Sequence, residues 1–186
     1  MLTTLDPLAA LVVIDLQKGI VGLPTAHPAA EIVGRAARLA AAFRRCGLPV
    51  ALVNVTGMAP GRTESKLSGG ARPADWTELA PELDPQPGDH LVAKQRWGAF
   101  IGTSLDEYLR KRGATQIFLA GIATSIGVES TARSAYDLGY NVVTVLDAMT
   151  DRSMESHRRS VELVFPRLGE TTNSEAVLSA LEKRER

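Results

Sequence analysis

Asp15 has the residue type and position that acid–base chemistry needs. It ends an apolar run that begins at Ala10, and a carboxylate there is costly unless it is paired or lies at an opening. Partial burial and a nearby ammonium group shift a carboxyl pKa in opposite directions, so Asp15 is a candidate general acid or base. The competing interpretation is a carboxylate that only caps a neighbouring loop or helix.

Lys94 begins a second group, in which two cations, an indole and a Gly-Ala step follow an apolar run. We expect Lys94 to pair with Asp15 across a sheet, and Arg96 to offer a bidentate fork to an anionic substrate. The alternative is a solvated basic turn, with Trp97 and Phe100 packed into the core.

The segment from Gly121 to Arg133 is typical of a turn that leads from a strand into a helix. Such a turn would direct free backbone N–H groups and the positive end of the helix dipole toward a pocket. Thr124 or Ser125 could cap the helix. A purely structural turn would use the same residue types.

Alternating apolar runs and helical patterns predict the elements that position these groups. Strands are expected at 10–16, 49–55, 90–93, 116–120, 141–146 and 170–172, and helices at 28–46, 104–113, 126–138, 153–165 and 174–183. Residues 56–88 are predicted to form a long loop with one short helix near Trp76, as a lid or subunit contact. This alternation indicates a parallel sheet covered on both faces. Its ligands would bind beyond the carboxyl ends of the strands, where Asp15, Lys94 and the segment after Ala120 are expected.

Length, composition and charge exclude several classes of protein. The 186 residues suffice for one domain, 1–186, and 45% apolar with 23% charged residues is an ordinary globular composition. The formal net charge is zero, so we expect neither nucleic acid nor a membrane as a partner. The N-terminus lacks a signal-peptide pattern, and no apolar run approaches the roughly 20 residues of a membrane helix. We therefore expect a cytoplasmic protein.

Three motifs together resemble the isochorismatase-like hydrolase superfamily. They are Val-Val-Ile-Asp-Leu-Gln around Asp15, Lys-Gln-Arg-Trp-Gly-Ala-Phe from Lys94, and Gly-Ile-Ala-Thr-Ser-Ile-Gly-Val-Glu-Ser-Thr-Ala from Gly121. The resemblance spans about residues 8–165. It implies an α/β, Rossmann-like fold, namely a three-layer αβα sandwich with a six-stranded parallel sheet, usually in a homo-oligomer such as a dimer or tetramer. It also implies a non-proline cis peptide between Ile122 and Ala123 that turns backbone N–H groups toward the substrate.

The sequence departs from the family at the position of its usual cysteine nucleophile. Most members combine Asp, Lys and Cys, whereas Gly127 is the matching residue here. Cys46 ends the first predicted helix and is expected to be a small buried apolar residue. Ser125 and Ser130 lack the required offset, and no histidine base is close to them in sequence.

No metal and no other cofactor is expected. The Asp-x-His motif of nicotinamidases is replaced by Asn54-Val55-Thr56, and the three histidines lack metal-ligand spacing: His27, His90 and His157. The lone Cys46 also excludes an internal disulfide and a cysteine-rich metal site.

Isochorismatase itself resembles this chain in having Ile-Gly where most members have the cysteine, and it cleaves a vinyl ether without a covalent intermediate. By this resemblance Asp15 is the acid that protonates the enol-ether carbon, after which water adds and the hemiketal collapses. Lys94 would position Asp15 or bind the substrate, a small and anionic molecule. Gly127 is counted with Asp15 and Lys94 in the expected catalytic site, where a glycine leaves room for the ligand to approach the backbone. The residues expected to bind the substrate are Arg96, Trp97, Phe100, Ile122 and Ala123.

Two alternatives remain open. One is a non-catalytic ligand-binding or interaction protein that keeps the family pocket, and the other is a structural homo-oligomer with a vestigial site. The protonation state of Asp15 also stays open, because Lys94 lowers the pKa of this carboxyl while burial raises it.

Overall fold

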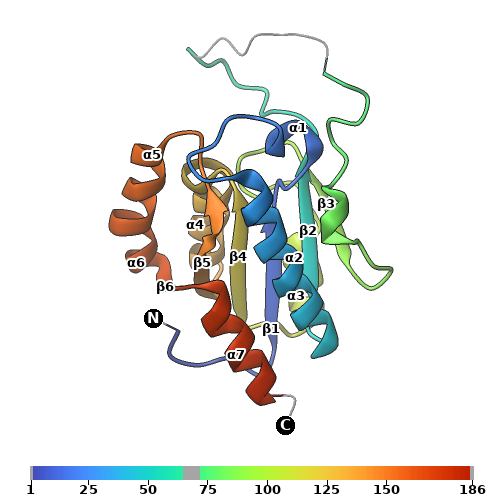
Figure 1. Cartoon of the computed structure of the whole chain (residues 1–186), viewed down its shortest axis with the longest axis vertical. Helices are drawn as coiled ribbons and strands as arrows, with labels where there is room; N and C mark the ends of the chain where they lie inside the picture. The colour runs from blue at the N-terminus through green and yellow to red at the C-terminus, as the bar shows by residue number, and fades with distance from the viewer. Residues whose placement is uncertain (1, 65–71, 185–186) are drawn as a thin grey trace.

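A six-stranded, fully parallel sheet forms the centre of the protein in a computed structural model, which describes residues 2–64 and 72–184. The strand order is β3-β2-β1-β4-β5-β6. The strands are β1 (Ala9–Ile14), β2 (Val50–Val55), β3 (His90–Lys94), β4 (Gln116–Ile122), β5 (Asn141–Thr150) and β6 (Gly169–Thr172). Helices cover both faces of the sheet (Figure 1), which confirms the predicted three-layer αβα sandwich.

The helices differ widely in length. They are α1 (Lys18–Val21), α2 (Ala29–Arg45), α3 (Leu105–Lys111), α4 (Glu129–Asp137), α5 (Met154–Arg159), α6 (Phe165–Leu168) and α7 (Ser174–Arg184). The short 3-10 helix η1 covers Pro81–Leu83, and two π-helical segments, η2 (Thr124–Val128) and η3 (Ser160–Val164), lead into α4 and α6. Among the described residues, no helix is long and apolar enough to cross a membrane.

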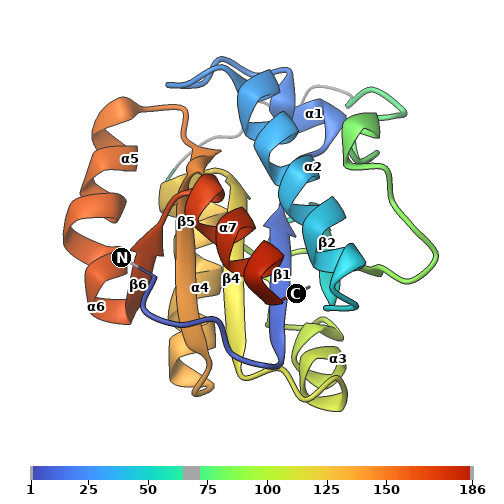
Figure 2. The ribbon, with the colours of Figure 1, turned by 60° about the horizontal axis from the view of Figure 1, so that its bottom comes forward.

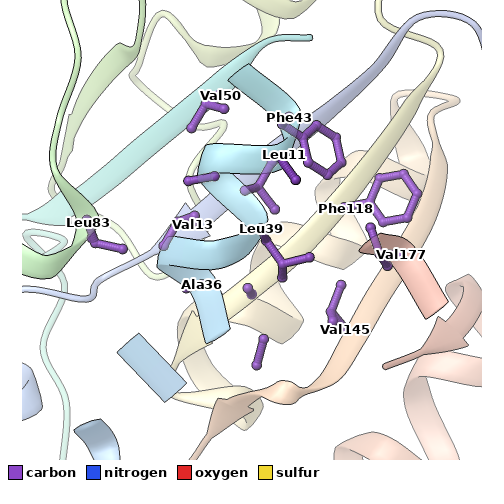
Figure 3. Packing of buried hydrophobic residues seen from close by; sticks show 14 of the residues in the cluster. Leu11, Val13, Ala36, Leu39, Phe43, Val50, Leu83, Phe118, Val145 and Val177 are labelled. Carbon is purple, nitrogen blue, oxygen red and sulfur yellow. The ribbon is translucent and has the colours of Figure 1, made fainter. Parts of the chain in front are cut away.

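Side chains of β1 alternate between two hydrophobic clusters, as expected for a strand buried on both sides. Leu11 and Val13 pack toward α2 and α7, which lie on the same face in Figure 2, whereas Val12 and Ile14 pack toward α3 and α4. Figure 3 shows the first cluster, in which the rings of Phe43 and Phe118 meet edge to face. The alternation therefore places Ile14 on the α4 side.

The strand order reverses between β1 and β4. β2 and β3 extend the sheet to one side of β1, and β4, β5 and β6 extend it to the other. In open parallel sheets, ligands bind beyond the carboxyl ends of the strands at such a point. Asp15 directly follows β1, and η2 follows β4 within two residues, so both lie at this point.

Some predicted bounds differ from the structure. β1 ends at Ile14 because Asp15 has a φ of 53°, in the left-handed region where a strand does not continue. β5 runs to Thr150 instead of 146, and its register with β4 shifts in the stretch that holds Asp147. Trp76 lies in a turn rather than a helix.

Two further differences concern helices and the long loop. The predicted helix 153–165 consists of α5, η3 and α6, and the predicted helix 126–138 begins as η2. Part of the predicted loop 56–88, residues 65–71, lies outside the described residues.

Candidate active site

Asp15 and Lys94 form a buried ion pair at the carboxyl edge of the sheet. The Lys94 Nζ donates to Asp15 Oδ2 at 2.7 Å and to the carbonyl oxygen of Arg96 at 3.1 Å. Their side chains are 2% exposed for Lys94 and 8% for Asp15. Because β2 lies between β3 and β1, Lys94 reaches across one strand to make the contact expected from the sequence.

The other carboxylate oxygen of Asp15 has no partner. Oδ1 is buried and accepts no hydrogen bond from the described residues. Burial raises the pKa of the Asp15 carboxyl from 3.8 to about 6, against the lowering effects of the Lys94 charge and hydrogen bond. A carboxyl group with such a pKa and a free oxygen can carry a proton and transfer it.

The amide of Gln17 holds the turn that follows Asp15. Gln17 Nε2 donates to the carbonyl oxygens of Val55 and Trp76, while its Oε1 accepts from the Val55 N–H. This side chain is buried, and its amide group exchanges two hydrogen bonds with the Val55 backbone, as the backbone of a neighbouring strand would. The left-handed Asp15 is therefore fixed from both sides, by β1 before it and by Gln17 after it.

Gly127, in η2, lies directly against this carboxylate. A Cβ atom built on Gly127 would lie 2.9 Å from Ile14 Cγ2, 3.1 Å from Asp15 Oδ2 and 3.6 Å from the Ile122 carbonyl oxygen. The peptide bond between Ile122 and Ala123 is cis. The Ala123 N–H donates to no acceptor among the described residues.

Thr131 links η2 to the segment that follows Lys94. Its buried hydroxyl donates to the Gly127 carbonyl oxygen at 2.7 Å and accepts from the Ala99 N–H at 3.1 Å. Gly98 also packs closely on α4, because a Cβ there would lie 3.2 Å from the Ser130 carbonyl oxygen. The positions of Gly127 and of the Lys94 segment therefore depend on each other.

Asp151, which the sequence analysis missed, fixes the first turn of η2. It is buried directly after β5, and its Oδ2 accepts from the Ser125 N–H at 2.7 Å and from Ser125 Oγ at 2.8 Å. Its Oδ1 accepts from the Arg152 N–H. The signal was available, since Asp151 follows a strand as Asp15 does, but the predicted strand ended at 146.

His27 and His157 meet beside the same turn, with 4.8 Å between their ring centroids. His157 Nδ1 lies 2.8 Å from Thr124 Oγ1, and His27 Nδ1 lies 3.0 Å from Thr150 Oγ1. Burial lowers the pKa of His157, and the neighbouring His27 lowers it further. A histidine therefore does lie beside η2, although it is distant in sequence. Within residues 2–64 and 72–184, no three His, Cys, Asp or Glu side chains form a potential metal site.

The remaining predicted residues separate into two environments. Arg96 is partly exposed and Trp97 is 67% exposed, so Trp97 is not the core residue of the alternative interpretation. Phe100 is 7% exposed and packs against Tyr140, at the amino end of β5, with 5.9 Å between the rings. The structure therefore places Phe100 in the core and does not bring it to Asp15, because its ring turns toward the opposite edge of the sheet.

Two cavities lie away from the Asp15–Lys94 pair. One of about 310 Å³ opens at the amino edge of the sheet, between the N-terminal segment and β4, β5 and β6. The other, of about 260 Å³, adjoins the start of α2 and is lined by His27, Arg35 and Asp147 among others. Neither of these two cavities is lined by Asp15, Lys94 or Gly127.

Comparison with known proteins gives consistent matches along nearly the whole chain. The family model described as Isochorismatase domain matches residues 9–176. The uncharacterized isochorismatase family protein YwoC of Bacillus subtilis is 44% identical over 176 residues, which cover 91% of this chain and 92% of that protein.

Two solved structures are similar as well. An isochorismatase family protein from Burkholderia thailandensis has a TM-score of 0.92 and 44% identity, covering 96% of this chain and 98% of that one. N-carbamoylsarcosine amidase from Thermoplasma acidophilum has a TM-score of 0.76 and 30% identity, with 90% and 97% covered.

Proposed function

Because the chain belongs to the isochorismatase family, a family of hydrolases, we propose that it hydrolyses a small carboxylated molecule without a cysteine nucleophile. The reaction is acid–base hydrolysis of a vinyl ether or a similar bond, with Asp15 as the acid and then the base, and Lys94 as its partner. The observation that carries this proposal is the buried, unpartnered Oδ1 of Asp15, on a carboxyl group with a pKa of about 6.

Proton transfer from Asp15 Oδ1 to the substrate carbon begins the proposed reaction. This produces an oxocarbenium ion. Water then adds to the oxocarbenium ion and gives a proton to the ionised Asp15, which forms a hemiketal. The hemiketal collapses to a carbonyl compound and an alcohol. Lys94 donates to Oδ2, so it leaves Oδ1 as the oxygen that carries the proton and stabilises the carboxylate once the proton has left.

Anionic groups of the substrate are held, in this proposal, at the start of the helix formed by η2 and α4. The Ala123 N–H has no acceptor there in the part of the chain that the structure describes, and the positive end of the helix dipole favours negative charge. Arg96 and Trp97 stand at the edge of the same site and are exposed enough to contact a ligand. Lys94 already donates hydrogen bonds to Asp15 and to the Arg96 carbonyl oxygen. In this proposal the cation that binds the substrate carboxylate is therefore the Arg96 side chain.

Amide hydrolysis through a thiol is not part of this proposal. Gly127 occupies the position that corresponds to the family's cysteine in the motif from Gly121 onward. The likeness to N-carbamoylsarcosine amidase therefore supports a similar fold, but the covalent chemistry of cysteine hydrolases requires a nucleophile that Gly127 does not supply.

Asp15→Asn tests the proposal because it keeps the size of the side chain and removes its proton. Purified protein would be assayed with isochorismate and with a panel of small amides. We expect turnover of the vinyl ether that falls as the pH rises above about 6, as Asp15 loses its proton. Asp15→Asn should lower kcat by about 100-fold or more, the usual contribution of a general acid.

Three results would count against the proposal. Turnover that survives both Asp15→Asn and Lys94→Ala would remove these residues from the reaction. Binding of the substrate without turnover would favour the alternative, a ligand-binding protein that keeps the family pocket. Hydrolysis of amides alone would reject the vinyl-ether class.

We also propose that the chain works in the cytoplasm as a homo-oligomer of two or four copies. Trp97 and Ile101, 67% and 64% exposed, lie on the segment that carries Arg96, so exposed apolar side chains adjoin the candidate site. Exposed apolar surface of this kind is typical of subunit contacts.

A further inference from the structure

Two consecutive residues at the start of η2 are tied to the part of the chain that follows β5. Ser125 donates both its N–H and its hydroxyl to the buried carboxylate of Asp151. Thr124 is fully buried, and its Oγ1 lies 2.8 Å from Nδ1 of His157 on α5. The first turn of η2, which directly follows Ala123, is therefore held by side chains from outside its own helix.

The hydrogen of the Thr124 hydroxyl has one acceptor. Among the described residues, the hydrogen-bond contact of Thr124 Oγ1 is with His157 Nδ1 alone, and a buried hydroxyl is costly to leave unpaired. The hydroxyl therefore donates to Nδ1, which is then the unprotonated nitrogen of a neutral imidazole. A protonated His157 would direct an N–H at the same oxygen, and the Thr124 hydrogen would lose its acceptor.

His27 makes the same kind of contact at the end of β5. Its backbone N–H donates to Thr150 Oγ1 at 3.1 Å, and its Nδ1 lies 3.0 Å from that oxygen, so the hydroxyl hydrogen is directed to Nδ1. The rings of His27 and His157 meet edge to face, with 4.8 Å between their centroids. Because two positive charges at this distance repel each other, protonation of one ring disfavours protonation of the other.

The ionisable groups that act on His157 come from two neighbouring segments. His27 precedes α2 and Asp151 follows β5, whereas η2 has no ionisable side chain. Burial lowers the pKa of His157, the charge of His27 lowers it further, and Asp151 raises it. The other ionisable side chains are those of α5 itself and those around the cavity that His27 borders, namely Glu155, Arg158, Arg159, Glu31, Arg35 and Asp147. Each arginine among them lies beside a carboxylate.

We propose that neutral His157 is a positioning residue for the substrate anion: through the Thr124 hydroxyl it fixes the first turn of η2, and with it the neighbouring Ala123 N–H. His27 assists by disfavouring the protonated form of His157. The inference rests on the proposed function, in which an anionic group of the substrate lies at this N–H. It gives the site a second dependence on pH, because Asp15 controls proton transfer whereas His157 controls binding.

Binding of pyruvate, a small carboxylate, tests the inference without any turnover. The dissociation constant would be measured from the amide NMR signal of Ala123 as pyruvate is added. We expect His157→Leu to weaken binding by about 10-fold, the order of one lost hydrogen bond to a charged group. His157→Asn should bind nearly as well as the natural chain, because its Oδ1 replaces Nδ1 as the acceptor for Thr124.

The natural chain should also bind pyruvate less tightly as the pH falls through the pKa of His157. Pyruvate stays ionised there, since the pKa of a carboxyl group beside a carbonyl lies far lower. His157→Asn, which does not titrate, should lack this loss. His27→Phe keeps a ring but no charge, so the NMR signal of His157 should titrate at a higher pH. His90→Phe is the matched control, because His90 stacks on Tyr108 of α3 and should leave this titration unchanged.

Turnover gives a further measurement. His157→Leu should raise KM by a factor similar to its effect on pyruvate binding and change kcat much less, since it removes an interaction made equally with the substrate and the transition state. If His157→Leu does not fold, Thr124→Val removes the same hydrogen bond from the other side, and Thr124→Ser, which keeps the hydroxyl, is its control.

Several outcomes would overturn the inference. They are an Ala123 signal that does not respond to pyruvate in the natural chain, equal affinities in His157→Leu and the natural chain, equal losses in His157→Leu and His157→Asn, and a neutral His157 that carries its proton on Nδ1. Pyruvate binding that depends on His157 in a chain without turnover would reject the proposed function alone. Turnover that depends on Asp15 but not on His157 would reject this inference alone.

Discussion

At the Asp15 carboxyl, burial and the Lys94 ammonium shift the pKa in opposite directions. Burial has the larger effect, and the pKa rises to about 6 from an ordinary value of 3.8. Because the folded-state pKa is the raised one, the protonated form favours folding. The protonated Asp15 makes its full contribution to the free energy of unfolding below about pH 4, and this contribution is lost as the pH rises through 6. For a pKa shift of this size, the contribution is on the order of 3 kcal/mol.

Lys94→Met should make stability depend more steeply on pH. Without the ammonium group, nothing lowers the pKa of Asp15, and its ionised form is buried without a partner. We expect the free energy of unfolding to fall by about 3–5 kcal/mol at pH 8, as when one member of a buried pair is removed. The loss should be smaller at pH 5, where Asp15 is protonated. Urea unfolding at both pH values measures the difference.

Lys18→Met is the matched control for this experiment. Lys18 pairs with Asp75 and Glu78, but its side chain is 42% exposed, so water screens the pair. Its removal should change stability little and equally at both pH values. An equal loss at pH 5 and pH 8 in Lys94→Met would contradict the role given to burial at Asp15.

A site residue could be predicted from the sequence only where the end of the strand before it could also be predicted. Asp15 and Lys94 follow strongly apolar runs, so the rule for parallel sheets brought them together from sequence alone. Asp151 was missed because Asp147, four residues earlier, resembles the end of a strand, although the chain passes through it in an irregular stretch of β5. The contact between His157 and Thr124 depends on the packing of α5 against η2, which no local pattern encodes.

At the scale of elements, α4 and the segment after Lys94 are held together by the Thr131 hydroxyl. Thr131→Val keeps the shape of the side chain but leaves the buried Ala99 N–H without an acceptor. We expect a loss of about 1–3 kcal/mol in the free energy of unfolding, the typical cost of an unsatisfied buried donor. Urea unfolding checks this, and Thr131→Ser, which keeps the hydroxyl, should lose clearly less. Equal losses in both variants would show that the methyl group matters rather than the hydrogen bonds.

The two π-helical segments could not be predicted from the sequence. Apolar periodicity indicated helices at 126–138 and 153–165, but an additional residue in one turn changes this periodicity too little to be noticed. The structure joins the segments through Glu129, the first residue of α4 directly after η2, which accepts from Ser160 Oγ at the start of η3. The carboxylate of Glu129 also accepts from Arg133, so this buried contact is fully paired.

At the scale of the whole molecule, the alternation of apolar runs and helical patterns predicted the sheet and its two helical layers. The same pattern says nothing about how many copies of the chain associate. The proposed oligomer predicts a mass by light scattering of two or four times the 19.9 kDa of one chain. Ile101→Glu should reduce this mass, because a buried charge without a partner is costly at an interface. Leu163→Glu, on η3, is the control for an exposed apolar residue on another element. A natural chain that elutes with the mass of one copy would reject the proposal.

The close approach of β4 to β1 at Gly121 has a consequence for directed evolution of this protein. Gly121 has a φ of 128°, and its missing side chain would overlap the Ile14 carbonyl oxygen. A library that randomises the residues around Asp15 should therefore return glycine at 121 in every folded clone, whatever reaction is selected.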